Sequence, residues 1–311
     1  MTHPLNVAAS IRAKLRNIAL AERRNFDDVF RFYIFERLLY RLSKSPYQDK
    51  LLLKGAMVFN AWGTQARRIT RDLDLMGFGN NNFVEELENI FRFICSTEVI
   101  PDGLEFLPNT VRGSSINQNQ KYRGGRIKMR AILSGTRTRS DLQIDIGFGN
   151  TVIPEAQRIS YPTLFDFPAP KIRVYPPETV IAEKFQVLVN LELDNTRLKD
   201  YYDLVYISHN FNFKSEILAR AIQATFAQRE TPIPTTLPLG LTKTFVEDLD
   251  KQRLLTKFYR EARVSNPVMS LAELVYKIIK FIFPIIESIN SKREWAKQWQ
   301  SEVEEWKNIS N

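Results

Sequence analysis

The apolar positions of the chain recur with two different periods. In the first 42 residues they return every three or four positions, which predicts two helices, Ala8–Glu22 and Phe26–Leu42, the second capped by Asn25. The short apolar segment Leu51–Leu53 and the alternating segment Asp72–Met76 instead favour strands. The chain is therefore predicted to begin with helices and to continue into a sheet.

Further helices and a hairpin are predicted around these strands. The stretches Ala56–Trp62 and Asn82–Thr97 both have a helical pattern. Arg126–Leu133 and Leu142–Gly149 alternate like strands on either side of a Ser-Gly-Thr turn, which indicates an antiparallel hairpin. The Gly-, Ser- and Asn-rich segment Arg112–Arg126 is predicted to be a loop or a ragged hairpin.

Prolines separate this region from a second one. The proline-rich segment Tyr161–Pro177 predicts an extended connector, and helical patterns dominate from Glu178 onward. The tail Lys292–Trp306, with alternating charges and tryptophans, is expected to be a surface helix or a docking element for a partner. The pattern as a whole predicts an α+β fold with two domains, residues 1–170 and residues 171–311.

Composition narrows the function classes. The chain has 311 residues, 44% hydrophobic and 25% charged, which is typical of a globular protein with a sizeable core. Its net charge of +9 favours an anionic partner such as RNA. The single cysteine, Cys95, forbids an internal disulfide and suits a reducing compartment, and two histidines argue against His-based zinc chemistry. We expect a cytoplasmic protein without a membrane partner, because the N-terminus lacks a signal-peptide pattern and Ile278–Ile286 is too short to span a bilayer.

Three carboxylates within apolar strands are candidate metal ligands. Asp72 and Asp74 stand two residues apart, so both point to one side of the sheet. Such like charges repel unless a cation lies between them, and Mg²⁺ prefers oxygen ligands. Asp145, between two isoleucines, is a candidate third carboxylate, and three acids on neighbouring strands would make a two-metal site for displacement at phosphorus. The alternative is that each is a surface carboxylate on the polar face of its strand.

Candidate phosphate contacts lie close to these carboxylates in the sequence. Gly55 stands just before a predicted helix, and the free N–H groups of a helix N-terminus form a natural seat for phosphate. A basic face could receive an RNA backbone, although arginine-rich strands and loops are also often solvated faces. Its candidates are Arg67, Arg68, Arg112, Lys121, Arg123, Arg126 and Arg130.

One lysine in the second region is out of pattern. Lys184 falls in the apolar sector of the predicted helix Glu178–Glu192, which is costly unless its ammonium meets an anion or reaches solvent. On the next helix, Arg197–Ile207, Asp200 shares the apolar face and Asp203 lies beside it. One interpretation is a buried Lys–Asp bridge between two helices. The other is that Lys184 binds the triphosphate of a nucleotide while an aspartate orients it, and both can hold.

Four segments carry a resemblance to a known family. They are Leu53-Lys54-Gly55-Ala56, Arg68-x-Thr70-x-Asp72-Leu73-Asp74-Leu75, Tyr175-Pro176-Pro177-Glu178-Thr179-x-x-Ala182-Glu183-Lys184 and Arg197-x-Lys199-Asp200-x-Tyr202-Asp203-Leu204. In this order, over residues 8–210, the chain resembles the AbiEii/AbiGii-type nucleotidyltransferase toxins, which include the MenT-like proteins.

The resemblance implies a fold and an activity. The fold would be a polymerase-β-like nucleotidyltransferase palm, a small mixed sheet flanked by helices, followed by a mostly helical C-terminal half that completes the nucleotide site. The protein would be the toxin of a bacterial toxin–antitoxin system, often used in phage defence. It would use two Mg²⁺ ions and a nucleoside triphosphate to transfer a nucleotide to RNA, at the 3′ end of tRNA, and a cognate antitoxin would neutralise it.

The resemblance also assigns roles to residues. The implied metal ligands are Asp72, Asp74 and Asp145, and the other implied catalytic residues are Lys184, Asp200 and Asp203. The implied nucleotide-binding residues are Lys54, Gly55, Ala56, Arg68, Thr70 and Lys184. Ala56 is a departure, because the family usually has Gly or Ser there; a serine hydroxyl would help to hold phosphate, whereas the N–H of Ala56 is still present.

Two alternatives to RNA modification stay open. The same site could transfer a nucleotide to a Ser, Thr or Tyr hydroxyl of a protein. The chain could also be a non-catalytic module that binds nucleic acid or an antitoxin, with a decayed site at Ala56.

Overall fold

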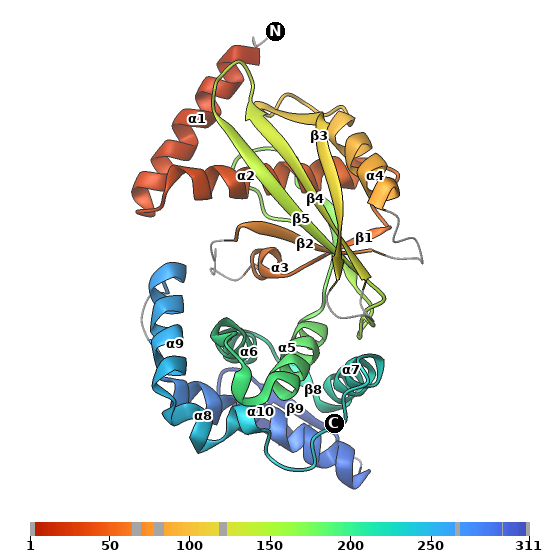
Figure 1. Cartoon of the computed structure of the whole chain (residues 1–311), viewed down its shortest axis with the longest axis vertical. Coiled ribbons are helices and arrows are strands. Elements are labelled where there is room, and N and C mark those ends of the chain that lie inside the picture. Colours follow the sequence, from red (N-terminus) through yellow and green to blue (C-terminus); the bar gives the residue numbers. More distant parts are fainter. Residues whose placement is uncertain are drawn as a thin grey trace. The chain divides into compact units, whose positions relative to one another are not determined.

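The computed structural model describes residues 4–63, 70–77, 84–117, 123–264, 268–293 and 295–308. They form two compact units (Figure 1). The first unit consists of Met1–Asn150 and Gln157–Tyr175, and the second of Thr151–Ala156 and Pro176–Asn311. The chain therefore leaves the first unit, returns to it for one short stretch, and leaves it again.

A seven-stranded mixed sheet is the centre of the first unit, with the strand order β3–β4–β5–β2–β1–β7–β6; Figure 1 labels β1 to β5 of this sheet. The strands are β1 (Leu51–Lys54), β2 (Asp72–Gly77), β3 (Leu104–Asn117), β4 (Arg123–Leu133), β5 (Arg139–Phe148), β6 (Gln157–Ser160) and β7 (Lys171–Val174). β2 lies between a parallel neighbour, β5, and an antiparallel one, β1. The mixed α/β fold is confirmed, and so is the predicted hairpin, because β4 and β5 pair antiparallel.

The segment Arg112–Arg126 belongs largely to a second hairpin. β3 continues to Asn117 and pairs antiparallel with β4, with a register shift between Leu107 and Arg112. Residues 118–122, which include Lys121, lie outside the described residues. Of the two predictions for this segment, the ragged hairpin is the one that the structure shows.

One face of the sheet is apolar and buried. It carries Leu73, Leu75, Ile127, Met129, Leu142, Ile144 and Ile146, each no more than 3% exposed. Helix α4 (Val84–Ser96) packs on β3 and β4, and Gly125 makes this approach possible, because a Cβ there would lie 2.2 Å from Leu87 Cδ1. Helices α1 (Pro4–Ala21), α2 (Phe26–Lys44) and α3 (Ala56–Ala61) complete the first unit. The residues between the apolar ones turn to the opposite face.

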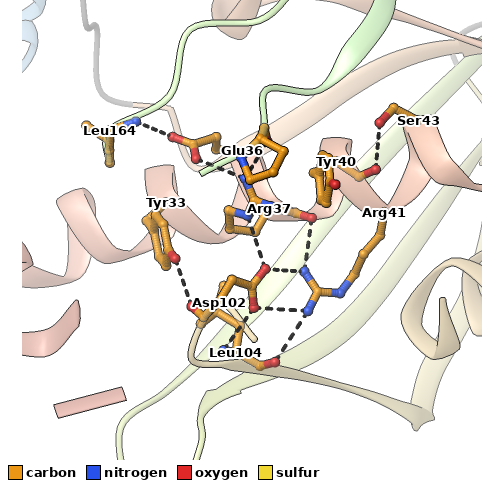
Figure 2. Close-up of polar contacts among 10 residues, drawn as sticks. Tyr33, Glu36, Arg37, Tyr40, Arg41, Ser43, Asp102, Leu104 and Leu164 are labelled. Atoms are coloured by element: carbon orange, nitrogen blue, oxygen red, sulfur yellow. Dashed lines mark hydrogen bonds and ion pairs between the residues drawn. The ribbon is translucent and has the colours of Figure 1, made fainter. Parts of the chain in front are cut away.

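Charged side chains of α2 are buried around Asp102, which precedes β3 (Figure 2). Arg41 donates to both carboxylate oxygens of Asp102, at 2.7 and 3.1 Å, and Arg37 donates from Nε at 3.1 Å. Glu36 is 0% exposed and accepts a hydrogen bond from the backbone N–H of Leu164 at 2.7 Å. Burial raises the pKa of Glu36 to about 7. Removing one partner of such a buried network is costly, so it fixes α2 against the segment before β3.

Helices and a small sheet form the described part of the second unit. The helices are α5 (Pro177–Leu191), α6 (Leu198–Asn210), α7 (Ser215–Gln228), α8 (Lys243–Glu247), α9 (Leu249–Ala262) and α10 (Leu271–Ser291), with 3₁₀ turns η1 (Glu192–Asp194) and η2 (Leu239–Leu241). The sheet has the order β10–β9–β8, formed by β8 (Phe213–Lys214), β9 (Lys297–Gln300) and β10 (Glu305–Asn308). None of the described helices is both long enough and apolar enough to cross a bilayer.

The prediction of a surface helix for Lys292–Trp306 is wrong. β9 and β10 pair antiparallel in this segment. Trp299 is 2% exposed, and its Nε1 donates to the carbonyl of Ser208 at 2.7 Å. A tryptophan that is buried with its N–H satisfied stabilises the sheet, so tertiary packing decides the local structure here.

Candidate functional site

The predicted carboxylates lie in register on the polar face of the first sheet. Asp74 of β2 is paired with Asp145 of the parallel strand β5, and Asp72 is paired with Gln143. On its other side Asp74 is paired with Lys54 of β1. Paired residues on neighbouring strands present their side chains to the same face. The sheet thus brings Asp72, Asp74 and Asp145 together from two strands that are distant in sequence.

Gly55 lies directly against the carboxylate of Asp74. Its φ is 71°, a left-handed conformation that favours glycine. A Cβ at this position would lie 2.0 Å from Asp74 Oδ2, well inside van der Waals contact. Ala56 follows as the first residue of α3, a helix of six residues. The turn from β1 into α3 therefore positions Asp74 as well as the predicted phosphate seat.

Asp145 is held by an arginine. Arg126 of β4 donates from Nε and Nη2 to the two oxygens of Asp145, both at 2.8 Å, and Gln143 Nε2 lies 3.3 Å from Oδ2. The hydrogen bond to Asp145 raises the pKa of Arg126, and the charge of Asp72 adds to this effect. The Arg126 side chain is 36% exposed and that of Asp145 18%, so the ion pair lies at the surface of the polar face.

The donor set fits a hard divalent cation in part. Carboxylate oxygens of Asp72 and Asp74 are ligands of the kind that Mg²⁺ prefers, whereas both oxygens of Asp145 are engaged by Arg126. Across the described residues, no group of three or more His, Cys, Asp or Glu side chains is spaced to hold a metal ion. A third ligand from Asp145 requires Arg126 to move away.

Thr70 and Lys54 flank the carboxylate row, which is the set Asp72, Asp74 and Asp145 on the polar face of the sheet. The Thr70 hydroxyl lies 2.8 Å from the carbonyl of Asp72 and 3.1 Å from its Oδ1, so it orients this carboxylate. A Cβ on Gly147 would lie 3.2 Å from Lys54 Nζ, which places the ammonium over β5. Arg67 and Arg68 lie outside the described residues.

The second unit contains a separate charged cluster. Lys184 of α5 lies 2.5 Å from Asp200 Oδ1 and 2.7 Å from Asp203 Oδ2, both on α6. Arg197 Nε lies 2.7 Å from the other oxygen of Asp200. Asp200 and Asp203 are each 1% exposed. Burial alone would raise the pKa of Asp200, but Lys184 and Arg197 outweigh it and hold that pKa well below its usual value. The predicted Lys–Asp bridge between two helices is confirmed.

Two residues of the first site are missing from its sequence-based prediction. Arg126 is predicted only as a contact for RNA backbone, and Gln143 carries no prediction. The turn between β4 and β5 carries the missing signal, because counting outward from the pair Ile132 and Arg139 places Arg126 opposite Asp145.

Comparison with known proteins identifies a family model that matches this chain. The model is described as "Nucleotidyl transferase AbiEii toxin, Type IV TA system", and it matches residues 37–274. No curated protein matches the chain.

Two crystal structures from Helicobacter pylori are similar to it at low identity. One is described as a "putative nucleotidyltransferase"; it is 16% identical with a TM-score of 0.48, over 86% of this chain and 99% of that one. The other, JHP933, is 16% identical with a TM-score of 0.43, over 82% of this chain and 90% of that one.

Proposed function

Because the chain belongs to the AbiEii nucleotidyl transferase toxin family of type IV toxin–antitoxin systems, we propose that it transfers a nucleotide from a nucleoside triphosphate to RNA. The acceptor in this proposal is the 3′ end of tRNA, the reaction depends on Mg²⁺, and it takes place in the cytoplasm. A cognate antitoxin protein is the partner that restrains it. The first sheet with its helices would be a polymerase-β-like palm.

One observation carries the proposal: Asp74 and Asp145 are paired on adjacent parallel strands, with Asp72 on the same face. We assign Asp72 and Asp74 to the metal, and Asp145 to the third position once Arg126 turns toward the phosphates of the nucleotide. Mg²⁺ bound there would stabilise the negative charge that develops on the phosphate.

The proposed reaction is an in-line displacement. A hydroxyl oxygen of the acceptor attacks the α-phosphorus, the bond from that phosphorus to the bridging oxygen breaks, and pyrophosphate leaves. Asp145 takes the proton of the attacking hydroxyl. Lys54, beside the carboxylates, neutralises phosphate charge. Ala56 retains its backbone N–H for a phosphate oxygen.

The test is incubation of the purified chain with Mg²⁺, bulk bacterial tRNA and each α-³²P-labelled nucleoside triphosphate in turn, followed by a denaturing gel. We expect a labelled tRNA band with the wild type and none with Asp74→Asn, a substitution that keeps shape but removes charge. The matched control is Asp166→Asn, because Asp166 is exposed and lies away from the site residues in sequence. It should label tRNA like the wild type.

The other outcomes separate the alternatives. Label that migrates with protein and resists ribonuclease would make a protein hydroxyl the acceptor. RNA binding that is independent of Mg²⁺ and unchanged in Asp72→Ala, with no label from any nucleotide, would favour a non-catalytic binding module. Full activity of Asp74→Asn would overturn the proposed mechanism.

A further inference from the structure

A cleft lies beside the candidate site, where polar residues of β4 and β5 meet the start of α2. Its volume is about 790 Å³. The residues that line it come from the start of α2, the residue before β2, and strands β3, β4 and β5. The charged residues among them are Asp27, Asp28, Arg31, Arg71, Lys128, Arg130 and Asp141.

The cleft adjoins the candidate site at Gln143. Gln143, which lines it, is paired with Asp72 on one side and with Lys128 on the other. Two residues further along each strand, on the same face, Arg130 is paired with Asp141. Polar side chains of β4 and β5 therefore lead from the carboxylates, through Gln143, to the cleft lining.

Where β3 lines the cleft, its pairing with β4 is irregular. The register between β3 and β4 shifts between Leu107 and Arg112. Thr110 stabilises the irregularity, because its hydroxyl donates to the carbonyl of Leu107 at 2.7 Å and accepts from the N–H of Arg130 at 3.0 Å. Bulges of this kind often re-aim side chains beside active sites, and here the bulge lies next to Lys128.

The cleft contains cations that its own acids do not neutralise. Arg130 Nε lies 2.8 Å from Asp141 Oδ1, and Arg31 lies 3.7 Å from Asp28. Lys128 and Arg71 are exposed, and among the described residues neither side chain has a hydrogen-bond or ion-pair partner. Asp27 is the remaining acid in the lining. The unpaired positive charge thus lies at the end of the cleft that adjoins Asp72.

The lining favours one chemical class of ligand. It contains no aromatic side chain on which a base could stack, and its apolar members, Met129 and Leu142, are 3% and 2% exposed. A small-molecule site is mostly apolar and aromatic, which this cleft is not. Phosphate groups on a flexible strand match exposed Lys and Arg side chains without requiring any base contact.

We propose that this cleft holds the sugar–phosphate backbone of the polynucleotide acceptor, with Lys128 and Arg71 contacting its phosphates and its reacting end directed toward Asp72. This inference rests on the proposed function, because it names where the acceptor of that reaction lies. It also states how the acceptor is held there: by its backbone, independently of base sequence.

The experiment measures RNA binding separately from catalysis. Fluorescently labelled bulk tRNA is titrated with the full chain carrying Asp74→Asn, with and without Lys128→Glu and Arg71→Glu, at several salt concentrations. We expect the double charge reversal to weaken binding at least about tenfold and to reduce the slope of log K against log salt by about 1.4, since each of the two lost phosphate contacts removes about 0.7. Lys171→Glu is the matched control, because Lys171 is an exposed lysine on β7 of the same sheet, outside the cleft lining.

A second series of variants tests whether weaker binding results from lost charge or from unfolding of the chain. Lys128→Gln and Arg71→Gln remove charge without reversing it, and they should weaken binding by a smaller factor while thermal unfolding stays as in Lys171→Glu. In the catalytically intact chain the same variants should raise the KM for tRNA and leave the KM for the nucleotide unchanged.

The outcomes distinguish this inference from the proposed function. Labelling of tRNA with an unchanged KM and salt slope in Lys128→Glu/Arg71→Glu would overturn the cleft assignment and leave the function intact. Binding that is lost in the double variant, in a chain that labels nothing, would support the cleft and refute the transferase. A chain that labels only protein and does not bind tRNA would overturn both.

Discussion

Arg126 holds Asp145 through two hydrogen bonds of 2.8 Å across β4 and β5, at the strand position where Asp145 also faces Asp74. A bidentate arginine pair is both directional and strong. The carboxylate proposed as the third ligand is therefore available to a cation only after its arginine has moved.

We predict that Arg126→Gln strengthens the response to Mg²⁺. Without the guanidinium, Asp145 is free to join Asp72 and Asp74, so the rise in melting temperature on adding Mg²⁺ should begin at a lower concentration. Arg158→Gln is the control, because Arg158 pairs with the exposed Asp49 on a different part of the sheet. An Mg²⁺ response that is equal in the two variants would contradict competition between the arginine and the metal.

Gly55→Ala should damage the site more than its backbone strain explains. The substitution places a methyl group against Asp74 Oδ2 and adds the cost of a positive φ, about 1–3 kcal/mol in general. Gly63→Ala is a close control, since Gly63 has a φ of 72° and a Cβ added there would meet nothing within 4 Å. We expect Gly63→Ala to lose stability only, and Gly55→Ala to lose nucleotidyl transfer as well. Equal activity in the two variants would show that the contact with Asp74 is unimportant.

Lys184→Met should destabilise the second unit, because it leaves Asp200 and Asp203 buried without their lysine. Breaking a buried ion pair costs about 3–5 kcal/mol. Urea unfolding at pH 7 measures this loss, with the exposed Lys214→Met as control. A loss below about 1 kcal/mol, set against that range, would show that the bridge contributes little.

The same cluster predicts a dependence of stability on acid pH. The pKa of Asp200 is lower in the folded chain than in the unfolded one, so its contribution is fully present above the unfolded pKa of about 3.9 and is lost as the pH falls below it. Between pH 6 and pH 2 the free energy of unfolding should fall less in Asp200→Asn than in the wild type. Parallel curves for the two proteins would contradict this assignment.

Glu36→Gln should make the folded chain more stable at neutral and alkaline pH. The pKa of Glu36 is raised by burial to about 7, so the folded chain retains a proton that the unfolded chain has released, and stability falls as the pH rises from about 4.3 to 7. The amide removes this titration and keeps an oxygen for the N–H of Leu164. We expect the variant to be more stable than the wild type at pH 8, by up to about 3 kcal/mol, and similar at pH 5. Urea unfolding at both pH values is the measurement, and Glu105→Gln, at an exposed position, is the control.

The strands that hold the site carboxylates can be predicted from the sequence, but the pairing between those strands cannot. Alternation around Asp72 and Asp74 places them on one face of a strand, and the Ser-Gly-Thr turn predicts the hairpin that contains Asp145. The parallel pairing of β2 with β5, which brings Asp74 to Asp145, joins segments about seventy residues apart, and no local pattern specifies it.

The structure of the charged tail is hard to predict for a related reason. Its alternation of charge and tryptophan fits either period, and the choice depends on tertiary contacts. Trp299 pairs with Phe213 of β8, and its ring lies 4.8 Å from that of Phe281 in α10. Both partners precede it by many residues, so its strand conformation depends on where the rest of the second unit packs.

The discontinuous first unit has a consequence for how the chain folds as it is synthesised. β1 is one of the first strands to be made, yet its parallel neighbour β7 lies at Lys171–Val174, after the chain has already contributed Thr151–Ala156 to the second unit. Until that strand has left the ribosome, β1 is an unprotected sheet edge of the kind that invites pairing with other chains. The nascent protein therefore cannot close the sheet that carries Asp72 and Asp74 until more than half of its length has been made.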